Sequence, residues 1–158
     1  MTNTNTNTNA GGTTRTLRDD ISSLVHRYAD AVVRRDGDQW GSTWAEDASW
    51  KLTKDRHVNG RADIVALWTK AMGGFQAVVQ NVLNGEATLD ASDPTKATGR
   101  WYIMEHFLRK DGVSGILLAY YDDTYACVEG RWLFASRALV AQYQGPPDLS
   151  APFLNAVS

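Results

Sequence analysis

The sequence holds a single cysteine, Cys127, among its 158 residues. One cysteine cannot pair within the chain, so no internal disulfide framework is expected, and the apolar neighbourhood of Cys127 predicts a small buried side chain. No apolar run is long enough to span a bilayer, and the first residues lack the positive charge and the apolar stretch of a signal peptide. These absences predict a cytoplasmic protein that does not associate with membranes.

Charge clusters and metal-ligand patterns are also missing. The 16 basic and 18 acidic residues are spread along the chain, and no basic block marks a nucleic-acid surface. The histidines His26, His57 and His106 are scattered without the short spacing of metal ligands. The sequence contains neither a glycine-rich nucleotide fingerprint nor a phosphate loop. We therefore expect no metal ion, no cofactor and no nucleic-acid partner.

Aromatic residues, by contrast, are abundant. Six Trp, six Tyr and four Phe, in a chain that is 43% hydrophobic, are sufficient for the core of one domain. The Thr, Asn and Gly repeats of residues 1–15 offer almost no apolar side chain for burial, so this segment is predicted to be a disordered low-complexity tail. A single folded domain is predicted over residues 16–158.

Helical periodicity begins at Leu17. Apolar residues recur there at steps of three and four and define one face of a helix: Leu17, Ile21, Leu24, Val25, Tyr28, Ala31 and Val32. Gly37 is the predicted stop, because glycine tolerates a left-handed conformation. Continued helical spacing places Asp36 on the same inward stripe. Asp36 is then either a helix-end residue that bonds nearby backbone or a base inside an apolar cavity, where burial raises its pKa.

The rest of the chain predicts two further helices and a sheet. A short second helix is expected over residues 38–44, a strand over 48–53, and a third helix from Gly60 to Gly73. Turn sequences then separate four long strands, predicted over 76–89, 97–109, 115–128 and 132–144. This order indicates an α+β fold in which three N-terminal helices pack in a strongly curved mixed or antiparallel sheet. Such a conical α+β barrel would enclose a small-molecule pocket.

Several short sequence motifs occur along the predicted helices and strands. They are Tyr28, Asp36 and Trp40, residues 44–48 (WAEDA), residues 60–64 (GRADI), residues 99–102 (GRWY), Tyr121, Asp123 and Tyr125, and residues 130–132 (GRW). Together they resemble the SnoaL-like family of the nuclear transport factor 2-like fold, which includes scytalone dehydratase, hexachlorocyclohexane dehydrochlorinase and bile-acid 7α-dehydratase. The resemblance extends over residues 17–143.

This resemblance implies a cofactor-independent lyase or isomerase that acts on a hydrophobic, cyclic substrate. Such relatives pair an Asp at the end of the first helix with a His on the first long strand. The two remove a proton from one carbon while a leaving group departs from the next. The Asp corresponds to Asp36, and the His position corresponds to Gln80. Glutamine can orient a group by hydrogen bonding but cannot carry a proton near pH 7.

The same resemblance makes His106 the second catalytic candidate, because scytalone dehydratase has a His at a comparable strand position. Side chains alternate along a strand, so Glu105 and His106 point to opposite faces and only one of them lines the cavity. Tyr121 and Asp123 share one strand face, where Asp123 either bonds a ligand oxygen or faces outward at a dimer interface. The residues expected to bind the substrate are Tyr28, Trp50, Gln80, Tyr102 and Tyr121.

Two alternatives stand beside the enzyme. The missing histidine favours a non-catalytic binder of hydrophobic small molecules, and the fold also suits a structural subunit like the β chain of a ring-hydroxylating dioxygenase. Proteins of this fold commonly dimerise through the open face of the sheet, so we expect a homodimer or a higher homo-oligomer. The expected partner in each case but the structural one is a hydrophobic small molecule.

Overall fold

The computed structural model describes residues 7–8, 14–53 and 55–154. Most of the predicted tail therefore lies outside the described residues. The described part of that segment forms two short antiparallel strands, β1 (Asn7–Thr8) and β2 (Thr14–Arg15). No helix in the described ranges is long and apolar enough to cross a membrane.

Helix α1 (Leu17–Arg34) is defined by its two ends. At the N-terminus, the Thr16 side chain accepts a hydrogen bond from the Asp19 backbone N–H, and the Asp19 carboxylate accepts one from the Thr16 backbone N–H. At the C-terminus, Arg35 takes the left-handed conformation, with φ 57°. The buried residues of α1 follow the predicted apolar stripe, so the prediction of this helix and its inward face is confirmed.

The link from α1 to helix α2 (Gly37–Gly41) differs from the prediction. The left-handed stop falls at Arg35, two residues before the predicted Gly37, which instead opens α2. Asp36 is the N-cap residue of α2 in an extended conformation and not the last residue of a longer α1. Extrapolating the spacing of 100° per residue to Asp36 was therefore wrong, because the helix had already ended.

Six strands make up the main sheet of the described chain. They are β3 (Trp44–Thr53), β4 (Arg56–Asn59), β5 (Phe75–Leu89), β6 (Lys96–Arg109), β7 (Ser114–Val128) and β8 (Arg131–Gly145). Their order is β4-β3-β8-β7-β6-β5, with β3 parallel to β8 and every other pair antiparallel. The four long strands match the prediction to within one residue at each end, whereas β4 was not predicted. Edge strands β4 and β5 do not pair with each other, so the described sheet is open. Of the predicted conical α+β barrel, the structure confirms the α+β class, with helices packed against a six-stranded mixed sheet.

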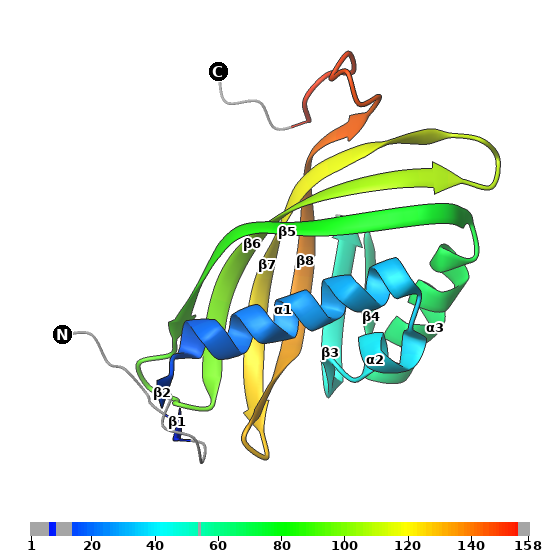
Figure 1. Ribbon diagram of the computed structural model, residues 1–158. Coiled ribbons are helices and arrows are strands. Elements are labelled where there is room, and N and C mark those ends of the chain that lie inside the picture. The colour runs from blue at the N-terminus through cyan, green and yellow to red at the C-terminus, as the bar shows by residue number, and fades with distance from the viewer. Residues whose placement is uncertain (1–6, 9–13, 54, 155–158) are drawn as a thin grey trace.

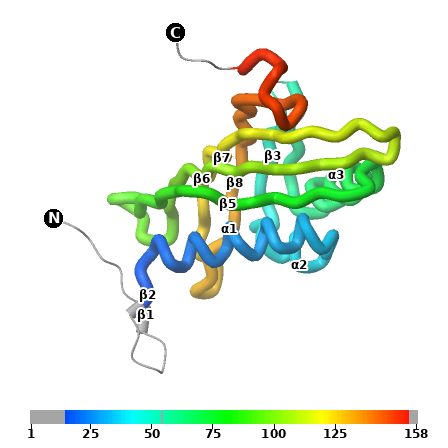
Figure 2. The backbone as a smooth tube through the Cα atoms, turned by 45° about the horizontal axis from the view of Figure 1, so that its top comes forward, coloured from blue at the N-terminus to red at the C-terminus, as the bar shows by residue number. Residues whose placement is uncertain are grey.

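Helix α3 (Arg61–Met72) follows Gly60, whose φ of 85° favours glycine, and its C-cap residue is Gly73, the predicted stop. Figure 1 shows α1 running along β5, with α2 and α3 gathered at the C-terminal end of α1 beside β3. Figure 2 shows β5, β6 and β7 side by side, in the order given by their pairing. The helices therefore cover one face of the sheet, which we call the inner face, and leave the outward face of β5 to β7 uncovered.

Tryptophans join the three helices to the sheet. Trp40 of α2 stacks on Trp68 of α3 with ring centroids 4.7 Å apart, and its ring also contacts Trp44 and Trp50 of β3. Tyr28 of α1 contacts Trp40 at 5.2 Å. All five rings are buried. This aromatic core fixes the position of α1 over the sheet, because aromatic side chains bury large areas and prefer such tilted and offset arrangements.

Gly85 provides a test of the packing between β5 and β6. The strand pairing shifts register between Val82 and Gly85, and a Cβ added at Gly85 would lie 2.3 Å from the buried ring of Trp101. We expect Gly85→Ala to lower the free energy of unfolding by about 1–3 kcal/mol, because the indole has no room to move. Urea unfolding measures this. Gly74→Ala is the control, since its added Cβ would meet only Ala71 O at 3.4 Å, and equal stability of the two variants would contradict the packing described.

Candidate functional site

A hydrogen-bonded pair of polar side chains lies on the inner face of the sheet. Gln80 of β5 and Glu105 of β6 are register partners, and Gln80 Nε2 donates to Glu105 Oε2 at 3.0 Å. Burial raises the pKa of Glu105 above its ordinary value of 4.5, and the hydrogen bond from Gln80 opposes this only in part. Within the described residues, no Lys or Arg forms an ion pair with this carboxylate. Glu105 is therefore a poorly solvated carboxylate whose orientation is held by a neutral partner.

Two buried tyrosines share this interior with Glu105. Tyr28 comes from α1 and Tyr121 from β7, and their rings meet edge to face with centroids 6.1 Å apart. Burial raises the pKa of both hydroxyls, and the negative charge of Glu105 raises both further. Both tyrosines are therefore protonated near neutral pH, and their hydroxyls are hydrogen-bond donors.

A buried ion pair lies beneath the tyrosines. Arg137 of β8 donates from Nε and Nη2 to the two carboxylate oxygens of Asp123 of β7, at 2.9 and 3.0 Å, and Tyr125 donates to the same carboxylate at 2.9 Å. The side chains of the ion pair are 1% and 0% exposed. The Arg137 guanidinium carbon lies 4.3 Å and 3.8 Å from the ring centroids of Tyr28 and Tyr121. Arg137 Nη1 is buried and has no hydrogen-bond partner in the described part of the chain.

Apolar side chains separate Glu105 from Tyr121 along the strands. Ile103 of β6 and Ala119 of β7 are register partners at the intervening inward position, and half-buried Leu117 and Leu139 pack against them. The inner face thus carries a carboxylate on one side, hydroxyl and guanidinium donors on the other, and an apolar surface between them. A carboxylate of raised pKa opposite neutral and cationic donors suits proton abstraction from a carbon whose neighbouring oxygen becomes negative.

A family model described as a SnoaL-like domain matches residues 13–138. The chain belongs to the SnoaL-like domain family. Among curated protein sequences, none matches this chain. The family assignment, together with the α+β architecture described above, confirms the resemblance and the nuclear transport factor 2-like fold predicted from the sequence.

Solved structures agree with this fold of the SnoaL-like domain. A candidate scytalone dehydratase from Novosphingobium aromaticivorans has a TM-score of 0.71 and 20% identity, over 84% of this chain and 93% of that one. Hexachlorocyclohexane dehydrochlorinase LinA-type3 from Novosphingobium barchaimii has a TM-score of 0.68 and 18% identity, over 87% and 93%. A candidate aromatic ring hydroxylase from Novosphingobium aromaticivorans has a TM-score of 0.72 and 21% identity, over 78% and 87%. At these identities the likeness supports the fold and not the reaction.

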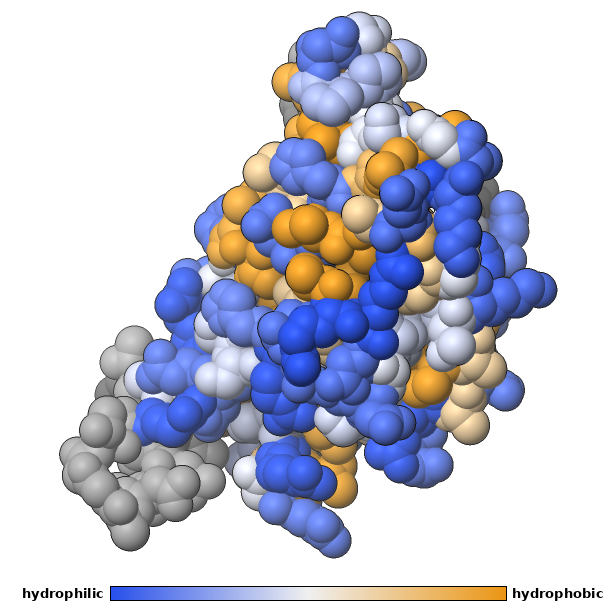
Figure 3. Space-filling model, turned by 45° about the vertical axis from the view of Figure 1, so that its right-hand side comes forward, coloured by the Kyte–Doolittle hydropathy of each residue, from blue (hydrophilic) through white to orange (hydrophobic). Residues whose placement is uncertain are grey.

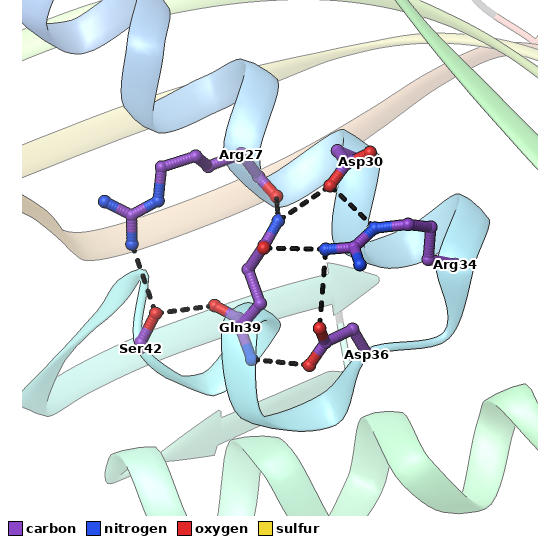
Figure 4. Close-up of polar contacts among 6 residues, drawn as sticks. All are labelled: Arg27, Asp30, Arg34, Asp36, Gln39 and Ser42. Atoms are coloured by element: carbon purple, nitrogen blue, oxygen red, sulfur yellow. Dashed lines mark hydrogen bonds and ion pairs between the residues drawn. The ribbon is translucent and has the colours of Figure 1, made fainter.

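Asp36, the catalytic base expected from the family, joins two helices in this SnoaL-like domain. Its Oδ1 accepts a hydrogen bond from the Gln39 backbone N–H at 2.8 Å, and its Oδ2 contacts Arg34 Nη2 at 3.4 Å. Figure 4 shows these contacts within a network that includes Asp30 and connects α1 to α2. The Asp36 side chain is 35% exposed. Asp36 therefore belongs to a helix-capping network, and among the described residues it makes no hydrogen bond with Gln80.

The other predicted site residues lie in three different places. His106 is exposed, and its register partners Val79 and Ile116 place it on the outward face, opposite to Glu105. Tyr102 also lies outward, with its ring 5.5 Å from that of Tyr120. Trp50 is buried in the aromatic core. Of the predicted binding residues, the structure brings Tyr28, Gln80 and Tyr121 to the interior of the SnoaL-like domain.

Sequence reasoning missed Glu105 and Arg137 as site residues. The alternation on β6 had allowed only one of Glu105 and His106 to face inward, and the family resemblance favoured the histidine. A signal for Glu105 existed in the pairing of β5 with β6, because the register that places Gln80 inward places Glu105 directly beside it. Arg137 carried no comparable signal, because the resemblance placed no site residue on β8 from which the register of β7 with β8 could be inferred.

Proposed function

We propose that this protein is a cofactor-independent lyase or isomerase in which Glu105 removes a proton from a carbon atom of a hydrophobic, cyclic small molecule. The observation that carries the proposal is the Glu105 carboxylate itself, half-buried on an apolar inner face and hydrogen-bonded to neutral Gln80. Burial raises its pKa, and a carboxylate of raised pKa is a stronger base toward a carbon acid than an ordinary one.

The proposed reaction needs no group beyond the substrate and the residues of this chain. A Glu105 oxygen takes the proton as the C–H bond breaks, and the electron pair of that bond forms a new double bond. In an elimination, the pair expels a leaving group from the adjacent carbon. In an isomerisation, the pair moves onto a conjugated oxygen and the proton returns at another carbon. Tyr28, Tyr121 and the unpartnered Nη1 of Arg137 supply donors for the developing negative charge.

Gln80 occupies the position where the family resemblance implies a histidine. Its Nε2 donates to Glu105 Oε2, which leaves the second carboxylate oxygen for the substrate proton. In our proposal Gln80 is a positioning residue, because an amide cannot act as a general acid or base near neutral pH. The apolar neighbours Ile103, Ala119 and Leu139 favour a substrate with a hydrocarbon ring.

The pH dependence of proton removal tests the role of Glu105. Only the ionised carboxylate accepts a proton, so the rate should rise with pH through the raised pKa of Glu105 and reach half its plateau above pH 4.5. A suitable probe is 2-tetralone, a bicyclic ketone whose α-protons exchange with D₂O and can be followed by proton NMR. Subtracting the exchange in buffer alone isolates the protein-catalysed rate. A half-maximal rate at or below pH 4.5 would contradict the assignment.

Binding without reaction is the alternative function, favoured by the neutral side chain of Gln80 at the family's proton-carrying position. Scytalone and hexachlorocyclohexane, taken from the names of the structural neighbours, serve with 2-tetralone as first probes. Calorimetry measures their binding, and NMR of the recovered ligand measures conversion. Tight binding with no exchange, elimination or rearrangement of any bound probe would favour the binder over the enzyme.

We also propose that the chain forms a homo-oligomer, and apolar side chains on the outward face of the sheet support this. Val79 and Leu83 of β5 are 45% and 51% exposed, beside half-buried Met104 and Leu118. Figure 3 shows apolar surface gathered in this part of the molecule, below the C-terminal segment. Sedimentation of the purified chain distinguishes a homodimer from a monomer, and co-purification of a larger catalytic chain would instead favour the structural-subunit function.

A further inference from the structure

A cavity of about 430 Å³ lies away from the inner-face site, between α1 and the turn that joins β7 to β8. From α1 it is lined by one side of the first turns, with Ser23, Leu24 and Arg27 among the lining residues. From the other side it is lined by Gly130, whose φ of 76° shapes the turn, and by the first residues of β8. Figures 1 and 2 both place this turn beneath the N-terminal half of α1.

Three guanidinium groups and one carboxylate line this cavity. Arg15 is already paired with Asp20 at 2.7 Å and also donates to Ser23 Oγ. Arg27 donates to a neutral oxygen, Ser42 Oγ, at 3.1 Å. Neither Arg27 nor Arg131 forms an ion pair with any carboxylate that the structure describes. The lining therefore carries two cationic side chains that no acid neutralises.

The residues outside the described ranges cannot supply the missing carboxylate side chains. The sequence has no Asp or Glu in residues 1–13, at position 54 or in residues 155–158. No Asp or Glu side chain of the chain is therefore paired with Arg27 or Arg131, and both can bind an anionic ligand. In direct contact, a guanidinium group can bind a carboxylate or a phosphate through two parallel hydrogen bonds.

Apolar side chains complete the cavity. Its lining includes Leu24 and Leu133, which are buried, and Trp132, which is half-buried. An indole face binds flat hydrocarbon rings by stacking, and the leucines exclude water from such a ring. The cavity therefore combines an apolar part with a cationic rim, which is the chemistry that recognises an oxyanion on an aromatic body.

We propose that this cavity binds small aromatic oxyanions, carboxylates or phosphate esters, with the ring against Trp132 and the oxyanion between Arg27 and Arg131. None of the residues that line it belongs to the proposed reaction site. The volume of about 430 Å³ is within the range of sites that hold small molecules. The site is thus a second binding site of the domain, independent of the reaction at Glu105.

Calorimetric titration with 2-naphthoate, 1-naphthyl phosphate and neutral 2-naphthalenemethanol tests the proposal. We expect the two anions to bind, their Kd to rise with NaCl concentration, and the neutral alcohol to bind at least about tenfold more weakly. Preference for the carboxylate or for the phosphate identifies the source of the oxyanion. Equal affinity for the alcohol and the anions would overturn the proposal.

Variants of the two arginines locate the binding. Arg131→Gln should raise the Kd of the anions at least about tenfold, and Arg27→Gln should do the same. Arg56→Gln, an exposed arginine on β4, is the matched control. Glu105→Gln should leave the Kd unchanged. Unchanged affinity in Arg131→Gln and Arg27→Gln, or loss of affinity in Glu105→Gln alone, would overturn the assignment to this cavity. Thermal unfolding of each variant confirms that it is folded.

Discussion

Glu105→Gln is expected to lower protein-catalysed exchange of the 2-tetralone α-protons at least about 100-fold, the usual contribution of a general base. The amide keeps the shape of the carboxylate and can still bond Gln80, but it cannot accept a proton from carbon. The measurement is proton NMR in D₂O, on the wild type and the variant at equal concentration. Glu86→Gln, which removes a carboxylate that is 81% exposed on β5, is the matched control and should retain activity.

Glu105→Gln is expected to lower activity but not stability. The pKa of Glu105 is raised in the folded chain, so the folded state holds this proton more tightly than the unfolded state does. The stabilising contribution of Glu105 is therefore present below its unfolded pKa and is lost as pH rises through its folded pKa. At pH 7 the charged, poorly solvated carboxylate destabilises the folded state, and the neutral amide of Gln avoids this destabilisation. We expect the Tm of Glu105→Gln at pH 7 to equal or exceed that of the wild type, so a lower Tm together with lost activity would point to simple misfolding.

Asp123→Asn is expected to have the largest effect on stability, lowering the free energy of unfolding by about 3–5 kcal/mol. The substitution leaves the Arg137 guanidinium fully buried without its countercharge. Burial lowers the pKa of Arg137, but the Asp123 carboxylate outweighs this and holds the pKa above its ordinary value. Urea unfolding at pH 7 measures the change.

The neighbouring residue is the natural control for Asp123. Asp122 also pairs with an arginine, Arg100, at 2.7 Å, but on the outward face, where both side chains are about half exposed. Such an exposed pair contributes about 0–1 kcal/mol, so Asp122→Asn should be nearly neutral. Replacing both buried partners, as in Asp123→Leu with Arg137→Met, should recover part of the loss. Equal effects of Asp122→Asn and Asp123→Asn would contradict a structural role for the buried pair.

The sequence predicted the fold far better than the site, for physical reasons that particular residues illustrate. The long strands after Gly74 were predicted because turn residues separate them and their apolar content is high. Helix α1 was predicted from one continuous stripe ending at Val32. Asp36 was misplaced because the stop depends on the left-handed conformation of Arg35, a non-glycine residue that no pattern marks.

The interior depends on pairings between distant segments, which periodicity cannot reveal. A shift of one residue in the register of β6 exchanges Glu105 for His106 on the inner face. The ion pair between Asp123 and Arg137 exists because β7 and β8 pair in one register, with both residues inward. Local sequence constrains which side chains alternate on a strand, but the assembled sheet decides which of them meet.

Parallel measurement of Asp36→Asn and Glu105→Gln is the most direct test of the proposed site. Asparagine keeps the helix-capping hydrogen bond of Asp36, so the Asp36 variant should remain folded. Exchange of the 2-tetralone α-protons at pH 7, corrected for the folded fraction, compares the two carboxylates under one condition. The assignment of Glu105 predicts that exchange is retained in Asp36→Asn and lost in Glu105→Gln. Loss in Asp36→Asn with retention in Glu105→Gln would contradict it.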